Sequence, residues 1–327
     1  MSDLYPMLCR PLFVPRIWGG RRLARLYGKP LPPGEPIGES WEVADLPEGS
    51  SWIANGAYES YRLGEATAEL GSSLVGAHWP AGPFPLLVKL LDANDDLSVQ
   101  VHPSAEDCAR WFPDAASKDE SWVVVDAEPG STVYFGFLPG VTQADFEARL
   151  GQESLLELLA KVAVRPGDVL RCAPGTVHAL GRGVAVLEVQ EPSDTTFRIH
   201  DFGRGRKVHL DEARRVVKVA SFAHPCLQPQ AVETEWGARE LLVDAPAYRM
   251  ERLSAEASLG WMVDPRSVQV LCLLEGTALI SAEHGTVRAN AGDCVLLPAL
   301  LGDVTLEPQD AAVAVLAGAG GVPMLGS

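Results

Sequence analysis

The sequence lacks the features that mark membrane-spanning and nucleic-acid-binding proteins. No run of apolar residues approaches the roughly 20 residues that cross a bilayer. Basic side chains are in a minority, 27 against 43 acidic ones, and the formal net charge is −16. Because nucleic acids and anionic membrane surfaces attract clustered basic charge, we expect no nucleic-acid partner and no membrane partner. A small anionic ligand would need a local group of Lys and Arg.

The chain also lacks paired cysteines and a glycine-rich phosphate loop. Its six cysteines form no C-x-x-C pair, and no basic and then apolar leader opens the chain, so we expect a cytoplasmic protein with reduced thiols. The Gly-Arg segments at 181–183 and 203–206 are too short for a phosphate loop and carry no Lys-Ser/Thr. Side chains would therefore have to hold a phosphate. The candidates, each of which could instead be an exposed salt-bridge partner, are Lys89, Lys118, Arg198 and Arg204.

Short β-branched and aliphatic segments bounded by Gly, Pro and Asp dominate the pattern. They predict strands at 86–91, 98–102, 122–126, 132–137, 184–190 and 197–201. Regular short strands favour a β-barrel or a sandwich. Helical periodicity is confined to 142–150 with 154–161, and to 209–220, and Thr142 with Asp145 forms a capping box. The sequence thus predicts a mainly β fold with a small α-helical insertion around 142–161.

A weak internal sequence repeat predicts two related β domains. The segment 167–174 is matched, with one residue fewer, by 292–298. Four residues past each proline the first copy has His178 and the second has Gly302. Since 327 residues suffice for about two domains, we place one domain at 1–235 and a second, without a metal, at 236–327.

One strand combines an amide with an imidazole. Gln100 and His102 alternate around Val101, so both side chains point to the same face. Glu120 and His178 lie near other strand ends. Two imidazoles, one carboxylate and one neutral oxygen suit a divalent ion such as Zn²⁺, with positions left for water or substrate. The alternative is that the two histidines are separate, hydrogen-bonded core residues.

Seven motifs, in order along most of the chain, match a known family. They are RIWGG at 16–20, IGESWE at 37–42, LLVK at 86–89, LSVQVHP at 97–103, KDE at 118–120, GTVHA at 175–179 and DTTFRIHDFGR at 194–204. Their order and spacing resemble the short bacterial form of the type I mannose-6-phosphate isomerases, members of the cupin superfamily.

The resemblance implies a fold, a reaction and a metal. The fold would be a cupin-type β-barrel (jelly roll) catalytic domain followed by a C-terminal cupin-like β domain. The reaction would be the metal-dependent interconversion of two sugar phosphates, mannose 6-phosphate and fructose 6-phosphate, through a cis-enediol. One Zn²⁺ per chain would be held by Gln100, His102, Glu120 and His178, although Mn²⁺, Fe²⁺ or Co²⁺ also suit these ligands.

The resemblance also implies catalytic and substrate-binding residues. Arg198 matches the active-site arginine, which we expect to stabilise enediolate or phosphate oxygens. Glu188, on the strand face that it shares with Gln190, is a plausible proton carrier; the alternative is a structural pair with Arg198. Lys118 completes the expected catalytic group, and the expected substrate-binding residues are Lys89, Trp18 and Arg204.

Two departures from the family pattern stand out. Leu180 replaces a tyrosine that longer relatives carry, so no step can use that hydroxyl. Asp119 stands where many relatives have proline, which bears on how Lys118 is presented. Two other functions therefore stay open. One is a sugar-phosphate sensor without turnover, and the other is an iron-dependent cupin oxidoreductase. The sequence leaves open the native metal, the acid/base residue and the oligomeric state.

Overall fold

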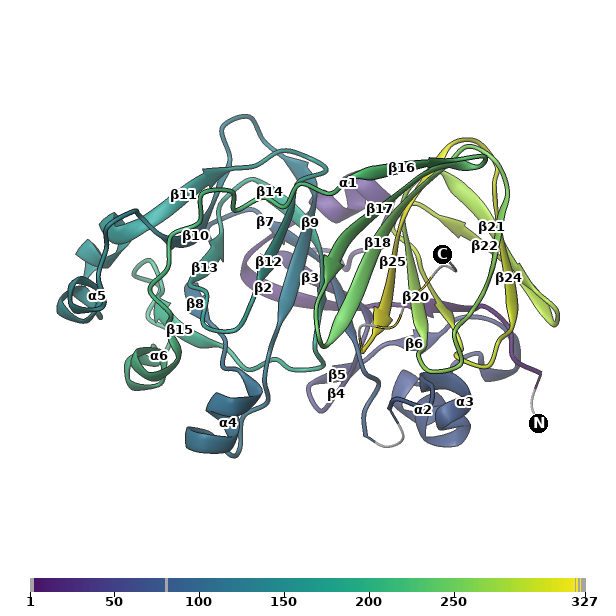
Figure 1. The fold of residues 1–327 in the computed structure, drawn as a ribbon, viewed down its shortest axis with the longest axis horizontal. Helices are drawn as coiled ribbons and strands as arrows, with labels where there is room; N and C mark the ends of the chain where they lie inside the picture. Colours follow the sequence, from purple (N-terminus) through teal and green to yellow (C-terminus); the bar gives the residue numbers. More distant parts are fainter. Residues whose placement is uncertain (1–2, 80–81, 321, 323, 325–327) are drawn as a thin grey trace.

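The computed structural model describes residues 3–79, 82–320, 322 and 324. Four large β-sheets follow one another along the long axis of the molecule, and helices lie at one end and along the edges (Figure 1). The mainly β prediction is confirmed. Among the described residues, no helix is both long and apolar enough to cross a membrane.

Two facing sheets contain the strands of the first 200 residues, apart from β1 (Met7–Arg10), β6 (Trp52–Ile53) and a short hairpin at 45–50. One sheet has six strands in the order β12-β9-β14-β7-β3-β2, and the other has five in the order β11-β10-β13-β8-β15. The strands of the six-stranded sheet are β2 (Leu12–Gly20), β3 (Ile37–Val43), β7 (Leu87–Ala93), β9 (Glu120–Ala127), β12 (Val169–Cys172) and β14 (Val184–Gln190). Those of the five-stranded sheet are β8 (Val99–Val101), β10 (Thr132–Phe137), β11 (Leu159–Ala163), β13 (His178–Leu180) and β15 (Phe197–His200).

Two further sheets contain the C-terminal strands. The eight-stranded sheet has the order β16-β17-β18-β25-β20-β23-β1-β6, and the four-stranded sheet the order β19-β24-β21-β22. The eight are β1 (Met7–Arg10), β6 (Trp52–Ile53), β16 (Ala231–Thr234), β17 (Gly237–Asp244), β18 (Tyr248–Ala255), β20 (Gln269–Glu275), β23 (Cys294–Leu297) and β25 (Ala312–Ala319). The four are β19 (Leu259–Met262), β21 (Thr277–Ala282), β22 (Gly285–Asn290) and β24 (Asp303–Pro308). β4 (Asp45–Leu46) and β5 (Gly49–Ser50) form a small hairpin.

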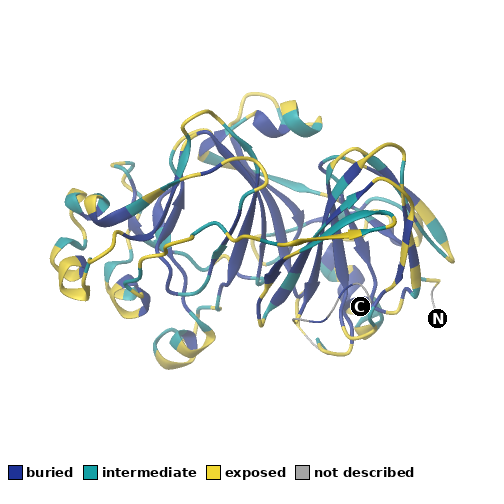
Figure 2. Cartoon of the chain, turned by 45° about the horizontal axis from the view of Figure 1, so that its top comes forward, coloured by how far each residue is buried: buried dark blue, intermediate teal, exposed yellow. Residues whose placement is uncertain are grey.

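Apolar side chains fill each space between neighbouring sheets. Trp122 and Phe135 belong to the core between the six- and five-stranded sheets. Val123, on the opposite face of β9 from Trp122, joins the core shared with the eight-stranded sheet. Leu271 and Ile280 belong to the core beneath the four-stranded sheet. Figure 2 shows the inner strands buried and the outer sides of the helices exposed. Because successive strand residues face opposite sides, strands such as β9 are apolar on both faces.

All six predicted strands are present, with ends that differ by at most two residues, as β7, β8, β9, β10, β14 and β15. The domain boundary at residue 235 stays a prediction. β1 and β6, from the N-terminal segment, pair with each other, and β1 pairs with β23.

The helices depart from the sequence prediction in number and in length. α5 (Gln143–Arg149) begins at the predicted capping box, where Thr142 Oγ1 accepts from the Asp145 amide at 3.2 Å. The predicted helix at 154–161 is instead a short 3₁₀ segment, η2 (Glu153–Leu158), followed by β11, and α6 (Leu210–Val216) ends before residue 220. Helical periodicity also missed α1 (Arg22–Tyr27), η1 (Gly56–Tyr58), α2 (Leu63–Leu70), α3 (Ser72–Val75) and α4 (Ala105–Trp111). Most of these elements span fewer than two turns, too short to show a period of 3.6 residues.

A buried ion pair lies in the N-terminal segment, and its lysine also donates to a C-terminal turn. Lys29 Nζ lies 2.7 Å from Glu42 Oε2 and donates to the carbonyl of Gly292 at 2.7 Å. Ser40 donates to the other carboxylate oxygen of Glu42. Both ionic side chains are almost fully buried, so each charge depends on the other.

We expect Lys29→Met to destabilise the protein by about 3–5 kcal/mol, because it leaves the Glu42 carboxylate buried without its cation. The free energy of unfolding in urea measures the effect. The double variant Lys29→Met/Glu42→Gln should recover much of that loss. Equal stability of Lys29→Met and the wild type would show that the pair does not hold the two segments together.

Candidate active site

The predicted metal ligands come together between the six- and five-stranded sheets. Gln100 lies in β8 and His102 directly follows that strand, His178 opens β13, and Glu120 opens β9 of the facing sheet. In the β13–β8 ladder, His178 pairs with Gln100. The ligands thus converge because two sheets place strand ends on opposite sides of one core.

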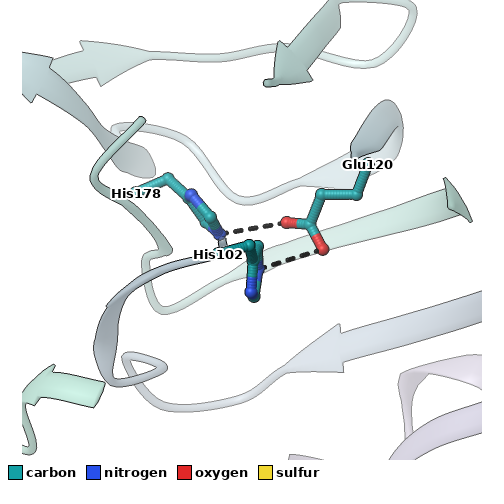
Figure 3. Close-up of side chains that lie close together, drawn as sticks. All are labelled: His102, Glu120 and His178. Carbon is teal, nitrogen blue, oxygen red and sulfur yellow. Dashed lines mark ion pairs between the residues drawn. The ribbon is translucent and has the colours of Figure 1, made fainter. Parts of the chain in front are cut away.

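The two imidazoles meet the carboxylate of Glu120 (Figure 3). His178 Nε2 lies 3.0 Å from Glu120 Oε1, and His102 Nε2 lies 3.4 Å from Glu120 Oε2. The ligand atoms of these three residues all fall within 4.8 Å of one another. All three side chains are buried, so the cluster is shielded from bulk water.

Backbone carbonyls fix the tautomer of both histidines. His102 Nδ1 lies 2.8 Å from the carbonyl oxygen of Thr195, and His178 Nδ1 lies 2.9 Å from that of Thr176. A carbonyl only accepts, so each Nδ1 carries the proton and each Nε2 presents a lone pair to the cluster. His178 Nε2 accepts from the Gln100 amide at 3.3 Å, whereas His102 Nε2 has no hydrogen-bond partner in the described part of the chain.

The electrostatics of the cluster suit a divalent cation. Burial lowers the pKa of His102 to about 3, and the positive charge of Lys118 adds to that effect, so the ring is neutral. Burial acts to raise the pKa of Glu120, but the ammonium of Lys118, 2.7 Å from Oε2, and the two imidazoles hold it well below its usual range. Neutral imidazoles, an ionised carboxylate and the oxygen of the Gln100 amide are ligands for a borderline divalent ion.

A row of polar side chains crosses the six-stranded sheet beside the cluster. The strand register places Trp41 of β3 opposite Lys89 of β7, Lys89 opposite Glu188 of β14, and Glu188 opposite Trp122 of β9. Residues opposite one another in a ladder share a face. Trp122 Nε1 donates to Glu188 Oε2 at 2.9 Å, and Lys89 Nζ lies 3.5 Å from Glu188 Oε1.

This row opens into a cavity of about 410 Å³. Its charged lining comprises five cationic and three acidic side chains, an excess of positive charge in a chain of net charge −16. The lining residues are Arg16, Trp18, Glu39, Lys89, Leu91, Leu97, Ser98, Gln100, Lys118, Glu188, Asp194, Thr196, Arg198 and Arg206. Gln100 and Lys118 contact the His–Glu–His cluster and also line the cavity, so the cluster and the cavity form one site.

Glu188 is the buried acid of the cavity wall. Burial raises its pKa, and the negative charge of Glu120 adds to that rise, while Lys118 and Lys89 act against it. A carboxyl whose pKa is raised toward neutrality can both accept and release a proton. The structure therefore places a group capable of proton transfer next to the cationic wall.

Arg198 presents a guanidinium to the cavity from β15. Its Nη1 donates to the carbonyl of Lys207 at 2.7 Å, while its Nε is buried without a hydrogen-bond partner among the described residues. Asp201 Oδ1 lies 3.9 Å from that Nε and is held by Arg206. The Arg198 guanidinium is thus anchored at one end and offers a donor that an anion can use.

The two remaining sequence-predicted residues, Trp18 and Arg204, lie in different places relative to the cavity. Trp18 lines the cavity, where Gly38 allows its close approach, because a Cβ at Gly38 would lie 2.6 Å from Cζ3 of Trp18. Arg204 is outside the cavity lining. Its Nη1 donates to the carbonyl of Asp96 at 2.6 Å and its Nε to that of Asp201 at 3.0 Å. Its position gives the predicted substrate-binding role no support.

Sequence reasoning missed four charged residues of the cavity wall: Arg16, Glu39, Asp194 and Arg206. Arg16 Nε donates to Glu39 Oε1 at 2.6 Å, across the β2–β3 pair. Alternation within the motif at 37–42 would have placed Glu39 on one face with Trp41, whose indole donates to Glu39 Oε2 at 2.6 Å. The predicted strands did not include β2 and β3, so this signal was not used.

Comparison with known proteins finds relatives that match most of the chain. A family model described as "Phosphomannose isomerase type I, catalytic domain" matches residues 9–131. The curated Mannose-6-phosphate isomerase ManA of Bacillus subtilis (strain 168) is 33% identical over 317 residues, covering 92% of this chain and 96% of that protein. The match extends far beyond the segment that the family model covers.

Solved structures share the fold. The crystal structure of the mannose 6-phosphate isomerase from Bacillus subtilis superposes with a TM-score of 0.86 at 25% identity, covering 96% of this chain and 99% of that one. A structure described as mannose 6-phosphate isomerase (holo; zinc bound) superposes with a TM-score of 0.76 at 19% identity, covering 95% and 98%. The predicted cupin-type fold class is confirmed.

We expect His178→Ala to lose most of its bound divalent metal, because the change removes an Nε2 lone pair that faces Glu120. Metal content per chain after dialysis, measured by elemental analysis, tests this expectation. His200→Ala is a matched control: His200 is also buried, but its Nε2 pairs with Glu153 outside the cluster. Full metal content in His178→Ala would remove His178 from the ligand set.

Proposed function

This chain belongs to the type I phosphomannose isomerase family, and from that premise we propose that it interconverts mannose 6-phosphate and fructose 6-phosphate. The observation that carries this conclusion is the shared site. A buried His–Glu–His cluster, whose two Nε2 atoms face one carboxylate, adjoins a cavity lined by an excess of cations and by one acid of raised pKa. Isomerisation of a sugar phosphate needs all three parts: a metal that polarises the carbonyl, a group that carries the proton, and positive charge that binds the phosphate.

We assign the metal site to Gln100, His102, Glu120 and His178, and zinc as its ion. The neighbouring fold described as zinc-bound supports the choice of metal. Bound there, a divalent ion supplies a Lewis acid that polarises the sugar carbonyl and offsets the charge of the enediolate. Lys118, 2.7 Å from Glu120 Oε2, holds that carboxylate and adds positive charge at the inner end of the cavity.

Glu188 is the residue that we assign to proton transfer between the two carbons of the enediol. Its Oε2 is fixed by the Trp122 indole, while Oε1 faces Lys89 at 3.5 Å. Proton transfer between neighbouring carbons requires one group that takes the proton and returns it, and its pKa is best near the working pH. Burial shifts the pKa of Glu188 upward, in the direction of that condition.

Arg198 and Lys89 bind the anionic parts of the substrate, and Trp18 packs against the sugar. The buried Nε of Arg198 gains a hydrogen-bond partner when an anion enters the cavity. Because a guanidinium stays protonated at all working pH values, Arg198 stabilises negative charge and does not transfer protons. This cationic wall favours a phosphorylated substrate over the chemistry of an iron-dependent cupin oxidoreductase.

The purified protein is expected to convert mannose 6-phosphate to fructose 6-phosphate in a coupled assay. Activity should disappear after chelation and return with zinc, since the site needs a metal to polarise the carbonyl. Fructose 6-phosphate formation measured before chelation, after chelation and after zinc addition tests both claims. Absence of turnover with zinc fully loaded would contradict the isomerase and favour a sugar-phosphate sensor.

Arg198→Ala is expected to keep its metal but lose roughly 100-fold or more in kcat, because a charge-stabilising donor aimed at the transition state is removed. Parallel measurement of kcat and of zinc content separates this role from a structural one. Arg198→Lys, which keeps the charge without the planar fork, should fall between Ala and the wild type. A fall in zinc content that matches the fall in rate would make Arg198 a scaffold residue.

A further inference from the structure

The segment that carries Lys118 and Glu120 faces two cores at once. Lys118 lines the cavity, and Trp122 reaches Glu188 in the cavity wall. Because side chains alternate along a strand, Asp119 and Ser121 point the other way, toward the eight-stranded sheet. All five side chains are buried. A contact on the far side of this segment can therefore act on the site through the backbone.

One phenol from the eight-stranded sheet contacts both of the far-side residues. Tyr248 opens β18 and is fully buried. Its hydroxyl lies 3.2 Å from Asp119 Oδ1 and 2.8 Å from Ser121 Oγ. A carboxylate accepts only, so the phenol donates to Asp119 and its oxygen accepts from the Ser121 hydroxyl. A single hydroxyl thus holds the residues on both sides of Glu120.

Two other residues complete the attachment of Asp119. Arg171 binds its carboxylate with two donors, Nε to Oδ1 at 3.1 Å and Nη2 to Oδ2 at 2.6 Å. The Asp119 amide donates to Glu191 Oε2 at 2.8 Å, and the Glu191 amide donates to the Asp119 carbonyl at 3.1 Å. Arg171 and Glu191 belong to the same half of the molecule as the site. Tyr248 alone among these partners comes from the C-terminal strands.

We propose that Tyr248 is a positioning residue for the active site, through which the eight-stranded sheet sets the places of Glu120 and Lys118. This inference rests on the proposed function for its link to turnover, but not for its link to metal binding. The physical basis is a short covalent connection: one peptide bond joins Glu120 to each of the two residues that the phenol contacts, Asp119 and Ser121. Groups that orient metal ligands commonly affect metal affinity or activity by about 10- to 100-fold.

The direct test is Tyr248→Phe, which keeps the buried ring and removes the hydroxyl. We expect the zinc dissociation constant, measured by competition with a chromophoric chelator, to rise about 10-fold. At saturating zinc, kcat should fall several-fold while KM for mannose 6-phosphate changes less than about twofold, because Tyr248 does not line the cavity. Metal affinity and the split between kcat and KM are readouts that loss of stability alone does not change.

Tyr5→Phe is the matched control. The Tyr5 hydroxyl also makes two hydrogen bonds, donating to the Asn55 carbonyl at 3.0 Å and accepting from the buried Tyr58 amide at 2.8 Å, but it lies outside the site. Tyr5→Phe should lower Tm and leave zinc affinity and kcat unchanged. If Tyr248→Phe behaves in the same way, with only Tm lowered, the proposal is wrong and the phenol only stabilises the fold.

A mutant cycle tests the route from the phenol to the metal. In the background Asp119→Ala/Ser121→Ala, the further change Tyr248→Phe should have no additional effect on zinc affinity, since both partners of the hydroxyl are gone. A full additional effect would overturn the proposed route. Weaker zinc binding by Tyr248→Phe in a protein that lacks isomerase activity would support the positioning role and refute only the proposed reaction.

Discussion

The site depends on one fully buried carboxylate. Glu120 lies between two sheets with its charge balanced by the Lys118 ammonium, beside the His102 imidazole, which burial keeps neutral. An ionised carboxylate out of contact with water is unfavourable unless cations and hydrogen-bond donors surround it. A divalent ion bound here would complete that balance of charge. It would also give a partner to the lone pair of His102 Nε2, which faces the Glu120 carboxylate and has no hydrogen bond among the described residues. The two sheets thus hold the carboxylate and the imidazoles independently, in positions where all three could bind one divalent ion.

The acidic surface and the cationic cavity serve different purposes. A net charge of −16 disfavours non-specific association with polyanions, while the cavity concentrates guanidinium and ammonium groups, of which the ammonium groups of Lys89 and Lys118 are buried. In such a place each interaction with a phosphate is stronger than at the surface. Acidic neighbours such as Glu39 and Asp194 keep these cations in position before a substrate enters.

Sequence periodicity predicted more of the strands than of the helices, and more of the ligands than of the cavity wall. Gln100 and His102 could be placed on one face because alternation is a local property of a strand. The meeting of these residues with Glu120 and His178 depends on the packing of two sheets. The residue types suggested it, with separate core histidines as the alternative, and the family resemblance implied the full ligand set. Arg206 was missed because its entry into the cavity depends on long-range packing, whereas Glu39 was missed because the strand that carries it, β3, was not predicted. The role of Arg204 stays a prediction, since two of its donors bind backbone carbonyls and it does not line the cavity.

The pairing of β1 with β23 makes the order of synthesis matter. Met7 lies opposite Leu296, so the hydrogen bonds between β1 and β23 cannot form until β23 has been synthesised. Until then Met7 and Leu8 lack these partners, although Cys9 and Arg10 can already pair with β6, and an incompletely paired apolar strand invites association with other chains. The eight-stranded sheet that contacts the site through Tyr248 is thus completed late in synthesis, by strands far apart in the sequence.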